Sequence, residues 1–182
     1  MGGVWTAVAL GWGAALVFGV TSVAQTPTTK PGFVVVPAEV FKDPNGEKPG
    51  LLLGIFDGQD FMNQLVNKIT PMVDLAAKDG DPPDPDYPSN NDYGVRWRGN
   101  ILPPVSGDYT LEIQSTGGAA LYVGDATVID ALTEKGPQDR RGVVKLEAGK
   151  LVAVEVDFLQ VKGPARCDLL WKPPSDGATS KP

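Results

Sequence analysis

Residues 94–130 read GVRWRGNILPPVSGDYTLEIQSTGGAALYVGDATVID, and this stretch decides the fold. In its first run, Val95, Trp97 and Ile101 alternate with Arg96 and Arg98. This alternation is the period-two pattern of a half-buried strand. We therefore expect Trp97 to point into a core.

Turn residues and further strand patterns follow along the same stretch. Pro103 and Pro104 have no N–H to donate to a ladder, so the first strand must end there. The run 106–108, Ser-Gly-Asp, supplies turn residues, and residues 109–113 alternate again. A short loop at 115–118 leads into a third apolar run at 121–123. The pattern predicts an antiparallel meander, with a hairpin over 108–123.

Seven segments of the chain resemble, in order, the segments of a PA14 domain. They are residues 50–56, 96–99, 104–110, 115–123, 128–130, 144–150 and 163–174. The resemblance implies an all-β fold, namely an antiparallel β-sandwich or barrel of the PA14 type. It also implies a module found in secreted glycosidases, adhesins and toxins, which binds carbohydrate in several members.

The first residues have the character of an export signal. Residues 1–24 carry no charged side chain, and the apolar run ends at small residues, Ser22 and Ala24. This predicts a signal peptide cleaved after Ala24 and a secreted, periplasmic or cell-surface protein. An uncleaved membrane anchor is the alternative, because roughly 20 apolar residues span a bilayer. We expect a linker at 25–32, the β domain at 33–174 and a disordered tail at 175–182.

Four further segments receive a structural prediction. Residues 61–77 repeat apolar side chains at about helical spacing, which predicts a short helical or irregular insertion broken at Pro71. The polar stretch 130–142 is predicted to be a loop. We expect residues 151–159 to form an amphipathic strand with Glu155 and Asp157 on its solvent face. Residues 165–171 are predicted to form a strand with Cys167 and Trp171 inside.

An acidic, proline-rich loop spans residues 74–92. Its carboxylates Asp79, Asp81, Asp84 and Asp86 are the candidate ligands for a calcium ion, which takes six to eight oxygens. Their spacing is not that of an EF-hand. The alternative interpretation is a solvated surface loop.

Composition excludes several kinds of chemistry. The chain has no histidine, which removes histidine-activated nucleophiles and the commonest zinc ligand. A net charge of −6 without a basic stripe argues against nucleic acid as a partner. We expect a non-catalytic module, with an accessory module of a glycoside hydrolase as the alternative. The single cysteine cannot form an intramolecular disulfide.

The resemblance also indicates where a ligand would bind. In lectin-like PA14 members, sugar binding uses calcium held by two adjacent aspartates in one loop. The matching loop of this chain reads Ser115, Thr116, Gly117 and Gly118. Both carboxylates are missing, so no calcium is expected there. No cofactor is expected, except for calcium at the acidic loop.

Two functional hypotheses follow from these observations. The first is a glycan-binding module that uses the polar groups of the 115–118 loop and an exposed aromatic ring, either Tyr87 or Tyr93. The second is a structural or protein-interaction domain of an extracellular assembly, whose partner is a cell-surface or extracellular protein. An aromatic platform beside Thr116 would favour the first, and a free sheet edge or apolar patch would favour the second.

Overall fold

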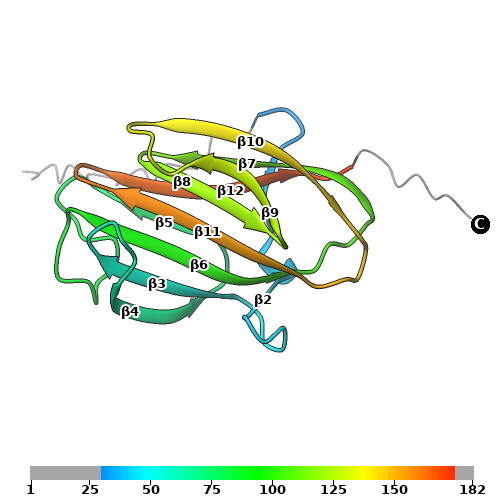
Figure 1. The fold of residues 1–182 in the computed structure, drawn as a ribbon, viewed down its shortest axis with the longest axis horizontal. Helices are drawn as coiled ribbons and strands as arrows, with labels where there is room; N and C mark the ends of the chain where they lie inside the picture. The colour runs from blue at the N-terminus through cyan, green and yellow to red at the C-terminus, as the bar shows by residue number, and fades with distance from the viewer. Residues whose placement is uncertain (1–29, 175–182) are drawn as a thin grey trace, which may run out of the picture.

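The computed structural model describes residues 30–174 of the 182-residue chain. The predicted leader, the linker up to residue 29 and the predicted tail lie outside the described residues. The described part forms two antiparallel sheets that pack face to face (Figure 1). The predicted all-β sandwich is therefore confirmed. No helix within residues 30–174 is long and apolar enough to cross a membrane.

The first sheet, sheet A, has five strands, and β5 pairs with β12 beside β1. In spatial order its strands are β1 (Val34–Val35), β12 (Ala165–Lys172), β7 (Gly107–Ser115) and β10 (Gln138–Leu146), with β5 (Asp74–Ala77) next to β12.

The second sheet, sheet B, has seven strands, and β2 pairs with β6. In spatial order its strands are β4 (Asn63–Thr70), β3 (Leu51–Asp57), β6 (Tyr93–Ile101), β11 (Val152–Gln160), β8 (Gly118–Val123) and β9 (Ala126–Ala131), with β2 (Phe41–Lys42) next to β6. A single 3₁₀ turn, η1 (Ala38–Val40), precedes β2.

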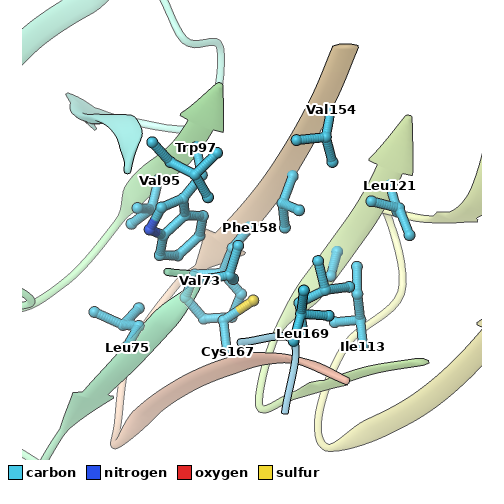
Figure 2. Packing of buried hydrophobic residues seen from close by; sticks show 14 of the residues in the cluster. Val73, Leu75, Val95, Trp97, Ile113, Leu121, Val154, Phe158, Cys167 and Leu169 are labelled. Carbon is cyan, nitrogen blue, oxygen red and sulfur yellow. The ribbon is translucent and has the colours of Figure 1, made fainter. Parts of the chain in front are cut away.

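The core lies between the two sheets and follows the predicted alternation. Trp97 and Phe158 of sheet B face Cys167 and Leu169 of sheet A (Figure 2). Trp97 is 1% exposed and Trp171 is 3% exposed. The inward positions predicted for Trp97, Cys167 and Trp171 are thus confirmed.

The predicted meander over 94–130 is wrong in its strand pairing. β7 pairs with β10 and β12 in sheet A, whereas β8 pairs with β11 and β9 in sheet B. The 115–118 loop therefore crosses the sandwich as an arch instead of closing a hairpin. Alternation identifies which face of a strand is buried, but it does not identify the neighbouring strand.

Two segments predicted to be irregular are strands. The 61–77 region contains β4 and β5, with the predicted break at Pro71 between them, and residues 138–142 belong to β10. Both β4 and β10 lie at a sheet edge and expose most of their side chains. Few of their inward positions carry apolar side chains, so their sequence lacks a clear period.

Candidate functional site

Five loops meet at one end of the sandwich, on the left in Figure 1. The strand register places them together, because Gly118 pairs with Leu159, Ser115 pairs with Gln138, and Ala77 pairs with Ala165. The loops are residues 58–62, 78–92, 116–117, 132–137 and 161–164. We call this region the loop end.

The arch at 115–118 is held in place by its own hydrogen bonds. The Ser115 hydroxyl donates to the Gly117 carbonyl over 2.8 Å. Thr116 N donates to the Arg166 carbonyl (3.0 Å), and Arg166 N donates to the Thr116 hydroxyl (2.9 Å). Thr116 is therefore held against β12, and of the four predicted contact residues in the arch it is the one that is not buried.

The two glycines of the arch are required by close backbone contacts. A Cβ atom on Gly117 would lie 2.0 Å from the Leu159 carbonyl oxygen, and one on Gly118 would lie 1.9 Å from the Leu132 oxygen. Backbone oxygens cannot rotate away as side chains can. The glycines thus shape the arch, and any ligand contact must come from Thr116 and its neighbours.

A hollow of about 350 Å³ opens on one side of Thr116. We call it the Gln138 hollow; its lining also includes Gln114, Asp139 and Arg166. Gln138 is 7% exposed, and its side-chain nitrogen donates to the Gly117 carbonyl over 3.2 Å. Its side-chain oxygen is buried and has no hydrogen-bond partner within residues 30–174. A buried acceptor without a donor is uncommon and marks a place where a ligand or water could bind.

Arg166 is fixed in the wall of this hollow by a polar network on the outer face of sheet A. Its Nε donates to Asp168 (2.5 Å), and its Nη2 donates to the Gln114 side-chain oxygen (3.1 Å). Gln114 donates in turn to Glu112 (2.8 Å), which also pairs with Arg141. Burial raises the pKa of Asp168, and the Arg166 hydrogen bond opposes that rise. Such a network holds the guanidinium in one orientation.

A second hollow of about 590 Å³ lies on the other side of Thr116, bordered by residues 132–136 and 159–162. The side-chain nitrogen of Gln160 donates to the carbonyls of Lys162 and Pro164, each over 2.9 Å. These bonds fix the loop between β11 and β12. Val161 of the same loop is 49% exposed, so this second hollow is bordered by an apolar side chain.

The predicted exposure of Tyr87 and Tyr93 is wrong. The two residues are 3% and 1% exposed, and their rings meet edge to face at 5.7 Å. The Tyr87 hydroxyl donates to the Phe56 carbonyl (3.3 Å). Burial raises the pKa of both phenols. The proline-rich loop folds back onto sheet B, which gives these rings an apolar environment that the local sequence does not reveal.

The acidic loop does not gather its four aspartates. Asp84 is buried, pairs with Lys68 and accepts the Asp86 N–H (3.0 Å), while Asp79, Asp81 and Asp86 are exposed. Within the described residues no group of three metal-ligating side chains lies close enough to hold an ion. Asp84 acts as the capping residue of a turn in this loop.

The predicted solvent face of β11 is also partly closed. Asp157 is 2% exposed and accepts two hydrogen bonds from Arg96, each of 2.6 Å. The Arg96 guanidinium carbon lies 4.3 Å from the centre of the Phe61 ring. The prediction that Asp157 faces solvent is therefore wrong, because a cation on the neighbouring strand and an aromatic loop residue cover it.

Two antiparallel sheets with hollows at one loop end define a β-sandwich module. The PA14 domain model matches residues 47–182, and the chain belongs to the PA14 domain family. The predicted resemblance is confirmed.

The chain is similar to the anti-sigma-I factor RsgI3 of Acetivibrio thermocellus, with 28% identity over 128 residues, covering 70% of this chain and 19% of that protein. It is also similar to an anti-sigma factor domain-containing protein from Clostridium clariflavum, with a TM-score of 0.63 and 26% identity over 71% of this chain and 42% of that one. The chain thus spans less than half the length of either protein.

A third relative shares the fold alone. The PA14 sugar-binding domain from an RTX adhesin has a TM-score of 0.55 and 18% identity, covering 66% of this chain and 88% of that chain.

Sequence reasoning missed Gln138, Asp139 and Arg166. Arg166 could have been placed from the alternation of its strand, because it lies between the inward Ala165 and Cys167. Gln138 and Asp139 gave no such signal, since their stretch was interpreted as a loop.

Proposed function

We propose that this chain is a carbohydrate-binding-type module that takes a glycan at its loop end. The glycan lies in the two hollows beside Thr116 and needs no calcium at the 115–118 arch. Membership of the PA14 family and the named sugar-binding PA14 domain among its structural neighbours support this proposal. The partner is a glycan outside the cell, which agrees with the predicted leader.

The observation that carries the proposal is the polar lining of the Gln138 hollow. Among the described residues the buried side-chain oxygen of Gln138 has no donor, and the guanidinium of Arg166 and the carboxylate of Asp139 line the same hollow. Sugar hydroxyls both donate and accept hydrogen bonds, so they match such a mixed set. Ligand sites typically combine a concavity with a few fixed polar groups, and the network around Arg166 provides that fixation.

A glycan array tests the proposal, run once with calcium and once with a chelator. We expect binding that is equal under both conditions. Loss of binding in the chelator would contradict calcium independence, and the variant Asp81→Asn with Asp84→Asn would then test the acidic loop.

The affinity of variants for the tightest-binding glycan of the array then locates the binding site on the surface. Gln138→Ala should weaken binding about two- to tenfold, the effect of one neutral hydrogen bond. Lys145→Ala is the matched control, because Lys145 is an exposed residue of the same strand near its other end. Equal affinity of all three proteins would contradict a site at the Gln138 hollow.

A free sheet edge favours the second function, a protein-interaction domain. Within the described residues β4 pairs only with β3, and its Leu65 and Ile69 are 45% and 51% exposed. An exposed edge with apolar side chains is a template for pairing with another chain. Self-association in sedimentation velocity that Ile69→Lys abolishes would support this function. A monomer at all concentrations, together with glycan binding, would contradict it.

A further inference from the structure

The outer faces of the two sheets differ in how they are covered. On sheet A, Lys30 pairs with Asp139 at 2.7 Å and the Phe33 ring lies 4.6 Å from the Arg141 guanidinium, so the first described residues cross that face. On sheet B, a hollow of about 360 Å³ remains between Pro44 and Tyr122. We call it the Tyr122 hollow.

Three side chains stand in a row across this hollow. Tyr122 of β8 lies opposite Glu155 of β11, and Glu155 lies opposite Arg98 of β6. In the next row along the strands Gly124 N donates to the Ala153 carbonyl over 2.8 Å, and Asn100 lies opposite Ala153. An aromatic ring, a carboxylate and a guanidinium thus border a floor of glycine and alanine.

Several polar groups around this hollow have unused hydrogen-bonding capacity. Within residues 30–174 neither the Tyr122 hydroxyl nor the Arg98 guanidinium has a hydrogen-bond or ion-pair partner, and Arg98 is exposed. Asn100 donates its amide to the carbonyls of Asp43 (2.8 Å) and Pro44 (3.3 Å), which leaves its side-chain oxygen to accept. The hollow thus offers hydrogen-bond donors and acceptors around the Tyr122 ring, and such fixed polar groups orient small polar ligands.

We propose that the Tyr122 hollow is a second glycan-contact site that takes one neutral sugar ring against Tyr122, and this inference depends on the proposed carbohydrate-binding function. The ring is neutral because Glu155 and Asp157 both pair with Arg96, so these two carboxylates and the guanidinium groups of Arg96 and Arg98 leave no net charge beside the hollow. Tyr122 lies six residues along the chain from Thr116, which corresponds to roughly 20 Å of strand. A single ring cannot reach both places, so the two sites hold different parts of a polysaccharide.

Affinity electrophoresis tests the inference with gels that contain arabinoxylan, galactomannan or hydroxyethyl cellulose. Wild type, Tyr122→Ala, Tyr122→Phe and Gln138→Ala are compared, and Val143→Ala on the opposite sheet is the control, since Val143 is 65% exposed. Thermal midpoints establish that each variant is folded. We expect Tyr122→Ala to weaken retardation about fivefold or more, while Tyr122→Phe, which keeps the ring and removes only the hydroxyl, weakens it by less.

The outcomes separate this inference from the proposed function. Equal retardation of folded Tyr122→Ala and wild type overturns the second site and leaves the loop end intact. Loss of retardation in Tyr122→Ala with unchanged retardation of Gln138→Ala supports a glycan site at the Tyr122 hollow and contradicts one at the loop end. If no polysaccharide retards the wild type, both proposals are overturned.

Discussion

Replacing Trp171 by alanine tests the core on which the arrangement of the loop end depends. Trp171 is 3% exposed, and its ring centre lies 5.1 Å from that of Tyr109 at an interplanar angle of 39°. Removing a buried tryptophan side chain costs about 3 to 5 kcal/mol, because the cavity that remains closes incompletely. The aromatic contact with Tyr109 accounts for about 0.5 to 1.5 kcal/mol of that loss.

This loss is large compared with the free energy of unfolding of a single domain, about 5 to 15 kcal/mol. For a domain of this size it lowers the thermal midpoint by about 10 °C or more. Urea unfolding followed by far-ultraviolet circular dichroism measures the change without relying on tryptophan fluorescence. Val143→Ala is the control, because an exposed side chain in β10 should alter stability by less than about 0.5 kcal/mol. An unchanged midpoint for Trp171→Ala would refute the register of β12.

Three further outcomes follow from single contacts. Cys167 should not react with a thiol reagent until the protein is unfolded, because complete burial raises the pKa of its thiol. Gly118→Ala should lower the thermal midpoint and the glycan affinity together, since the new Cβ meets the Leu132 oxygen. The hydrogen bond from the Lys48 N–H lowers the pKa of Asp43. In thermal melts, wild type should therefore be more stable than Asp43→Asn at neutral pH, and this difference should disappear as the pH falls below about 4.

Alternation in the sequence predicts the inward positions of three large or buried side chains of the core. Period-two alternation places Trp97, Cys167 and Trp171 inside, because a strand must bury one face whichever strand lies beside it. Which strand pairs with it in the sheet is decided by contacts between residues far apart in sequence. The arch at 115–118 was therefore taken for a hairpin turn, although it crosses from one sheet to the other.

Parts of the candidate site could not be predicted for the same physical reason. Tyr87 is buried against the Phe56 carbonyl, and Asp157 is covered through its pairing with Arg96. In each case the partner lies more than thirty residues away in the chain. The resemblance to PA14 domains pointed to the 115–118 loop, which lies at the loop end. The polar side chain of Gln138, which gives this end its chemistry, belongs to an edge strand without a periodic signal.

The most direct test of glycan binding at the loop end is a titration followed by nuclear magnetic resonance. The isotopically labelled protein is titrated with the best array ligand in the presence of a chelator, and the shifts of assigned backbone and side-chain amides are followed. We expect the largest shifts at Thr116, at the Gln138 side-chain amide and at Arg166. Shifts confined to the free edge of β4, or no shifts at a saturating ligand concentration, would contradict the proposal.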